Sequence, residues 1–321
     1  MPVTTAPSCA RLPAVSTAEP VLVAGSTGYI GRRLALRLAG SGNAVRCLAR
    51  NPGRAKDLEA AGCEVLVGDV LDPESLRWPL SGVRVAYYLV HSMGRGASGD
   101  FAESDLRAAT NFAEAAAEVG VERIIYLGGL GEGGSRHLRS RHETARALGS
   151  TGIDVTYMRA AVVIGAGSES FQTIYWLVRR LPAMITPRWT SVKTQPIGID
   201  DVVECLARAL KLDGNSEIQI GGPDVTTYGG MMDEMARAMG RRPPLRVKVP
   251  LLTPRLSSLW LGLITPVDVG VARPLVEGLS TETVVTAPPG PEELGVTPEP
   301  LAVVMRRAVE EMEAGLRRNP G

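Results

Sequence analysis

The sequence predicts an α/β protein, in which a Rossmann-type doubly wound parallel sheet is joined to a smaller, helix-rich C-terminal substrate region. Three observations predict this class. Short, continuously apolar segments alternate with helical segments up to about residue 165, and strands that are apolar along their whole length are typical of a parallel sheet covered on both faces. A glycine-rich turn follows the first apolar segment, and the alternation ends after about residue 165.

Six strands are predicted in the N-terminal part, each as a short apolar run bounded by polar, glycine or proline residues. They are Val21–Ala24, Val45–Ala49, Val65–Val67, Val83–Leu89, Arg123–Leu127 and Val155–Arg159. The helices predicted between them are Ile30–Leu38, Asp105–Val119 and Arg139–Leu148.

The C-terminal part is predicted to be mainly helical, and Ser168 is a favourable first cap for it. The helices are Ser168–Leu181, Asp201–Leu210 and Tyr228–Met239, and the short strands are Glu217–Ile220 and Val247–Val249. A last helix begins after Thr297 and Pro298, because apolar residues at positions 301, 304, 305, 308, 312 and 316 share one face.

This pattern divides the chain into four parts. They are a flexible tail over 1–18, a dinucleotide-binding Rossmann domain over 19–165, a smaller substrate-side region over 166–286 whose strands return to the sheet, and a Pro-rich linker with a C-terminal helix over 287–321. For the apolar segment 251–264 we favour a packed helix over a segment that lies on a membrane surface.

Composition excludes several classes of function. The 321 residues contain 35 Lys and Arg against 34 Asp and Glu, a net charge of +1, so no global field holds nucleic acid. The four cysteines form no CxxC pair, which argues against a disulfide framework or a zinc site and favours a reducing compartment. Neither a signal peptide nor a transmembrane segment is evident. We therefore expect a cytoplasmic protein without a metal.

The glycine-rich turn predicts a dinucleotide site. Gly25 permits a tight turn after the first strand, Gly28 lets backbone amides approach a pyrophosphate, and Gly31 lets the helix pack on the sheet. The residues expected to contact the cofactor here are Gly25, Ser26, Thr27, Gly28, Tyr29, Ile30, Gly31 and Arg32.

The end of the second strand favours NADP(H) over NAD(H). An NAD site places an acidic residue there to accept from the ribose hydroxyl, whereas this chain has Arg50 and no acid before Asp57. Arg50, helped by Arg32, is suited to hold a 2′-phosphate, although both arginines can also be solvated surface charges. Asp69 and Val70, after the third strand, are placed to meet the adenine, and the alternative for Asp69 is a turn-forming residue.

Further motifs carry a family resemblance. They are the GxxGxxG spacing of Gly25, Gly28 and Gly31, the segment Tyr88-Leu-Val-His91-Ser-Met-Gly94, the segment Arg123-Ile-Ile-Tyr-Leu-Gly-Gly-Leu130, the segment Ser140-Arg-His-Glu143 and the segment Gln195-Pro-Ile-Gly-Ile-Asp-Asp201. Over residues 20–285 the chain resembles the atypical, NmrA-like or epimerase-like, short-chain dehydrogenase/reductases. The resemblance implies a bound nicotinamide nucleotide. The further cofactor contacts that we expect are Leu89, Val90, His91, Gly128, Arg141, Ala160 and Ala161.

The catalytic pair of the related enzymes is replaced in this chain. Their Tyr-x-x-x-Lys motif, at the start of the helix after the fifth strand, corresponds to His137 and Arg141. Histidine is still a general acid near neutral pH, and arginine still supplies a positive charge and holds the ribose, but it does not deprotonate. His137 is therefore our candidate proton donor, and Arg141 our candidate support for the oxyanion and the ribose.

Three hypotheses about function follow. The first is an NADPH-dependent oxidoreductase that transfers hydride to a small apolar carbonyl, enone or quinone-like substrate, with a homodimer possible. The second is a non-catalytic NADP(H)-binding redox sensor or assembly factor, because the Tyr and Lys are missing. The third is an epimerase or dehydratase that retains its cofactor.

Overall fold

The structure is a computed structural model that describes residues 19–91, 101–132, 136–186, 188–248, 281–286 and 290–318. Within these ranges, the side chains of residues 101, 137, 185, 186, 188, 189, 247 and 248 lie outside the description. So do the predicted tail over 1–18 and the apolar segment 251–264.

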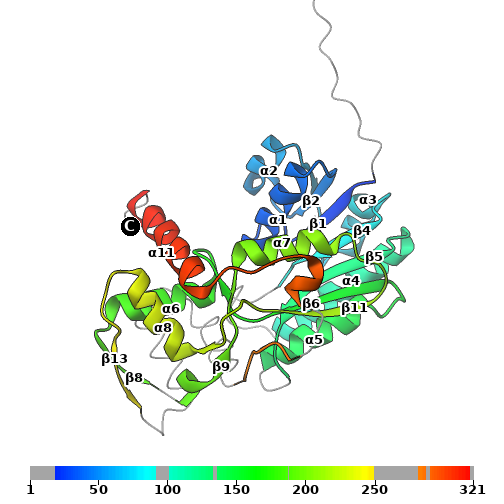
Figure 1. Cartoon of the computed structure of the whole chain (residues 1–321). Helices are drawn as coiled ribbons and strands as arrows, with labels where there is room; N and C mark the ends of the chain where they lie inside the picture. The colour runs from blue at the N-terminus through cyan, green and yellow to red at the C-terminus, as the bar shows by residue number, and fades with distance from the viewer. Residues whose placement is uncertain are drawn as a thin grey trace, which may run out of the picture.

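A sheet of seven parallel strands forms the centre of the N-terminal part, as predicted (Figure 1). Its order is β11-β6-β5-β4-β1-β2-β3, so the winding reverses between β4 and β1. The strands are β1 (Val21–Ala24), β2 (Val45–Ala49), β3 (Glu64–Val67), β4 (Val85–Tyr88), β5 (Arg123–Gly129), β6 (Asp154–Ala160) and β11 (Ser216–Ile220). All residues of β1 and β4 are buried, which explains their unbroken apolar sequences.

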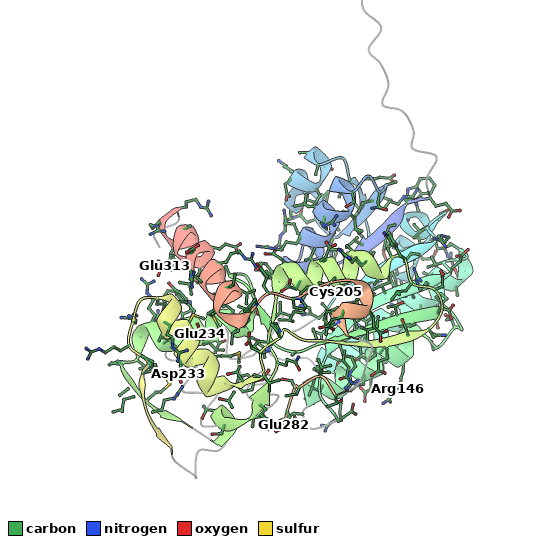
Figure 2. The ribbon with its side chains drawn as sticks, in the orientation of Figure 1. Arg146, Cys205, Asp233, Glu234, Glu282 and Glu313 are labelled. Atoms are coloured by element: carbon green, nitrogen blue, oxygen red, sulfur yellow. The ribbon has the colours of Figure 1, made fainter. Side chains whose placement is uncertain are left out.

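Helices cover both faces of this sheet. One face carries the helices α1 (Tyr29–Gly40), α2 (Lys56–Ala60) and α7 (Ile199–Ala209). A short 3-10 turn, η1 (Pro52–Arg54), follows β2 and lies beside β3. Those on the other face are α3 (Arg77–Leu80), α4 (Phe101–Glu118) and α5 (Arg136–Leu148), with the 3-10 turn η2 (Pro73–Ser75). Cys205, labelled in Figure 2, lies on α7 and is buried in the first of these cores. Burial raises the pKa of its thiol to about 12.

Three longer helices form a separate core at the C-terminal end of the chain (Figure 1). They are α6 (Glu169–Arg180), α8 (Tyr228–Ala238) and α11 (Leu301–Arg318). Phe171 and Tyr175 of α6 are fully buried in it. The small strand pairs around it are β7 (Val163–Ile164) with β10 (Ile197–Gly198), β8 (Ala183–Thr186) with β13 (Leu245–Lys248), and β9 (Lys193–Thr194) with β12 (Thr226–Thr227). A 3-10 turn, η3, spans Arg188–Ser191.

Part of the predicted Pro-rich linker packs against the sheet domain. The 3-10 turn η4 (Pro291–Leu294) lies beside α7, and Leu294 and Val296 are buried in the first core. Their apolar side chains explain why this stretch is not a solvated connector. The four domain boundaries themselves stay a prediction. Within the described ranges, no helix is long and apolar enough to cross a membrane.

Candidate functional site

The glycine loop lies at the point where the sheet winding reverses, between the carboxyl ends of β1 and β4. Gly25 has φ +88°, and a Cβ there would lie 2.6 Å from the Leu89 carbonyl oxygen. A Cβ at Gly31 would lie 2.2 Å from the carbonyl oxygen of Gly25. Because backbone atoms cannot move aside cheaply, the fold itself requires both glycines.

Gly28 is different, because its backbone conformation is one that any residue adopts and a Cβ there would be less crowded than at Gly25 or Gly31. It is exposed and extended, with φ −81° and ψ 171°, and a Cβ there would have one close neighbour, the Gly25 carbonyl oxygen at 3.1 Å. In the part of the chain that the structure describes, no side chain caps α1, and the N–H groups of Tyr29, Ile30 and Gly31 have no acceptor. These free amides at the positive end of a helix fit a pyrophosphate.

Two side chains of the loop hold it in place. The buried Ser26 hydroxyl donates to the Leu48 carbonyl, 3.1 Å away on β2. The ring of Tyr29 lies against the segment between β7 and α6, where a Cβ at Gly165 or Gly167 would come within 2.3 Å of it. The side chains of Ser26 and Tyr29 thus connect the loop to neighbouring segments, and the contacts of both residues with a cofactor stay a prediction.

The expected adenosine contacts meet at the ends of β2 and β3. Arg50 is exposed, and its Nη1 lies 3.9 Å from Oδ2 of Asp69. The carboxylate of Asp69 also accepts from the Leu71 amide at 3.0 Å, and Val70 is buried beside them. Arg32, by contrast, is held by an ion pair with Asp57.

The residues expected at the nicotinamide end lie at the ends of β4, β5 and β6. Leu89 donates its amide to Ala24 at 2.9 Å, and the amide of Ala161 donates to Ile220 at 3.3 Å. Gly128 has a packing reason to be glycine, since a Cβ there would lie 2.6 Å from the Tyr157 ring. The other three residues are Val90, which is half-buried, His91, which is exposed, and Ala160, which is buried.

Arg141 lies on α5 among groups that stabilise its positive charge. Burial opposes that charge, but interactions with Tyr126 and Asp105 raise the pKa of Arg141 overall. Both partners are buried. His137 lies in the first turn of α5, and its side chain is outside the description. The structure therefore places the half-buried Arg141 beside two buried polar groups, and the roles of Arg141 and His137 stay a prediction.

Glu169 is a candidate functional residue that the sequence patterns did not predict. It is the first residue of α6 and half-buried, and among the described residues its carboxylate has no hydrogen-bond partner. Burial raises its pKa, and the charge of Arg141 partly offsets this rise. The only sequence signal is its place after Ser168, which is typical of a solvated glutamate in a first helical turn.

A polar depression of about 830 Å³ lies outside α5, over β6 and β11. Arg146, labelled in Figure 2, is on its α5 side. The buried Arg159 donates to the Gly131 carbonyl at 2.8 Å and pairs with Glu217 at 2.6 Å. Nε2 of His142 lies 3.2 Å from the same carbonyl, so it carries the ring proton. These contacts fix the loop before α5, away from the glycine cradle.

The sheet order and the cradle define a Rossmann-like α/β fold with a site for an anionic group at a helix N-terminus. The chain belongs to the NmrA-like family, whose model matches residues 17–218. Its structural neighbours lie in the NAD(P)-binding atypical short-chain dehydrogenase/reductase and epimerase group. This agrees with the resemblance carried by the sequence motifs.

Individual relatives include both enzymes and an assembly factor. The (4-alkanoyl-5-oxo-2,5-dihydrofuran-3-yl)methyl phosphate reductase of Streptomyces griseus is 26% identical over 70% of this chain and 75% of its own length. A photosystem II assembly factor of Cyanophora paradoxa is 33% identical, but the match covers only 33% of each chain. The NADPH-dependent quinone oxidoreductase of Escherichia coli, solved with NADPH, has a TM-score of 0.70 at 19% identity, over 89% of this chain and 99% of its own.

Gly31→Ala is expected to destabilise the protein by about 2 kcal/mol or more, because the new methyl group would overlap backbone atoms of Gly25. Thermal unfolding followed by circular dichroism measures the effect. Gly40→Ala, at the other end of α1, is the control, since a Cβ there has no neighbour within 4 Å. Equal melting temperatures for Gly31→Ala and the native protein would contradict the packing role of Gly31.

Proposed function

We propose that the protein is an NADPH-dependent reductase that acts on a small apolar carbonyl, enone or quinone-like substrate. The observation that carries the proposal is the open cradle at Gly28, with free amides at the start of α1. Arg50 in place of an acidic residue at the end of β2 supports NADP(H) over NAD(H). The quinone oxidoreductase that shares the fold uses NADPH, and the Streptomyces relative is a reductase.

Each part of the chain has a separate task in this proposal. The amides of Tyr29, Ile30 and Gly31 would bind the pyrophosphate, and Arg50 would bind the 2′-phosphate. When bound, the cofactor supplies a hydride. His137 would donate the proton to the reduced substrate, and the charge of Arg141 would stabilise the oxyanion and support the ribose. A small-molecule substrate, a cytoplasmic location and a possible homodimer belong to the same proposal.

The test is NADPH oxidation by the purified chain with three kinds of acceptor: a benzoquinone, an α,β-unsaturated ketone and an aromatic aldehyde. The expected result is loss of the reduced nicotinamide absorbance with at least one acceptor, and formation of the reduced product by mass spectrometry. No turnover with any of them, despite measurable NADPH binding, would contradict the reductase proposal.

A second candidate is a non-catalytic NADP(H)-binding assembly factor. The observation that favours it is the 33% identity to the photosystem II assembly factor of Cyanophora paradoxa, together with the absence of the Tyr-x-x-x-Lys pair. The match covers about a third of the length of that relative. Binding of NADPH without turnover is the result that this candidate predicts.

NADPH is expected to bind at least tenfold more tightly than NADH, a difference of about 1.4 kcal/mol. Arg50→Glu should shrink or reverse this preference, because a carboxylate repels the 2′-phosphate and accepts from a ribose hydroxyl. Isothermal titration calorimetry with both nucleotides measures it. Arg306→Glu, an exposed charge reversal on α11, is the control. Equal dissociation constants in the native protein would contradict the assignment of Arg50.

A further inference from the structure

Arg32 connects the glycine loop to the segment that follows β2. It lies in the first turn of α1, directly after Gly31. Its Nη1 donates to Oδ1 of Asp57 in an ion pair, and its Nη2 donates to the Arg54 carbonyl at 2.5 Å. Both terminal nitrogens of the guanidinium are therefore engaged, one of them by a negatively charged oxygen.

The carboxylate of Asp57 accepts from the guanidinium of Arg32 in the way that a phosphate group would. Carboxylate and phosphate oxygens both accept from the outer N–H groups of arginine. The Asp57 side chain is half-exposed, so the pair is solvated and opens at small cost, since exposed ion pairs contribute about 0–1 kcal/mol. Its hydrogen bond with Arg32 lowers the pKa of Asp57, which keeps the carboxylate charged at neutral pH.

A second, weaker pair stands at the same edge of the sheet. Nη1 of Arg50 lies 3.9 Å from Oδ2 of Asp69, beyond hydrogen-bond distance. The formal charges of the two arginines, Arg32 and Arg50, and of their two carboxylate partners, Asp57 and Asp69, sum to zero. Asp57 is the carboxylate that engages an arginine by a hydrogen bond, and removing its charge would leave the group positive.

We propose that Asp57 is a specificity-determining residue, which competes with the ribose 2′-phosphate for Arg32 and so limits the preference for NADPH over NADH. The proposal rests on the proposed function only in that NADPH is the ligand. When the Asp57 carboxylate separates from Arg32, the hydrogen bond from Arg32 to the neutral Arg54 carbonyl remains and holds the guanidinium in place. The same negative charge that occupies Arg32 also repels the phosphate.

The test is calorimetric titration of the full chain with NADPH and with NADH at low ionic strength. Asp57→Asn keeps the size of the side chain and removes its charge. The expected result is NADPH binding that is about 3- to 10-fold tighter, in line with the modest strength of a solvated ion pair. Binding of NADH, which lacks the phosphate, should stay within about twofold. Glu59→Gln, an exposed and unpaired glutamate on α2 among the described residues, is the matched control and should change neither constant.

Other outcomes would overturn the proposal. Unchanged or weaker NADPH binding in Asp57→Asn would mean that Asp57 positions Arg32 instead of competing for it. Equal tightening in Glu59→Gln would assign the effect to the general charge of α2. Absence of NADPH binding in the native chain and in Asp57→Asn would contradict the proposed function as well, whereas binding that appears only in Asp57→Asn would support the competition. A melting temperature for each variant separates these results from misfolding.

Discussion

Gly28→Val is expected to weaken NADPH binding by about 100-fold or more, which corresponds to about 2.7 kcal/mol, while the fold remains intact. Gly28 has an extended backbone that any residue adopts, and the nearest atom to a Cβ there is the Gly25 carbonyl oxygen at 3.1 Å. A valine side chain there would push that carbonyl oxygen aside by a few tenths of an ångström, a smaller strain than at Gly25 or Gly31, where a Cβ would lie 2.6 or 2.2 Å from a backbone oxygen. It would fill the space in front of the free amides of α1, where a pyrophosphate must approach the backbone.

The measurement is calorimetric titration with NADPH, alongside the melting temperature of the variant. Gly28→Ala gives an intermediate case, because a methyl group fills less of the same space. Gly40→Val is the control at the opposite end of α1, where a Cβ meets open space. Native affinity in a folded Gly28→Val protein would mean that the glycine loop is only a structural turn, and the cofactor assignment would be wrong.

His137→Ala is expected to lower turnover by about 100-fold while NADPH affinity stays nearly unchanged, because a proton donor acts in the chemical step and not in nucleotide binding. Arg141→Ala is expected to lower both turnover and affinity. Its charge interacts with Tyr126 and Asp105, and in our proposal it supports the ribose and the oxyanion together. Steady-state kinetics and calorimetry on each variant separate the two effects.

Two variants keep this prediction separate from a loss of folding. Arg141→Lys retains the charge beside Asp105 and should retain most of the affinity. Arg139→Ala removes an exposed guanidinium from the same helix and should leave turnover close to native. A His137→Ala enzyme with its full rate would show that water or the substrate supplies the proton, and that α5 only frames the cofactor.

The sequence alone determined the parts of this protein that depend on local order. The apolar runs of β1 and β4 predicted buried strands, and the structure buries every residue of both. The spacing of Gly25, Gly28 and Gly31 predicted a strand, a turn and a helix, because a few consecutive residues specify this geometry. The sequence motifs carry the resemblance to the NmrA-like group, and the family model agrees.

Only the tertiary structure decided which side chains pair with one another. Arg32 and Asp57 are 25 positions apart, and Arg159 and Glu217 are 58 positions apart. No periodicity links such residues, because they meet only when packing brings α1 beside α2, or β6 beside β11. The half-buried position of Glu169 likewise depends on the elements that surround α6. Local sequence patterns therefore specified the glycine loop between β1 and α1, and long-range packing decided which charged side chains pair with one another.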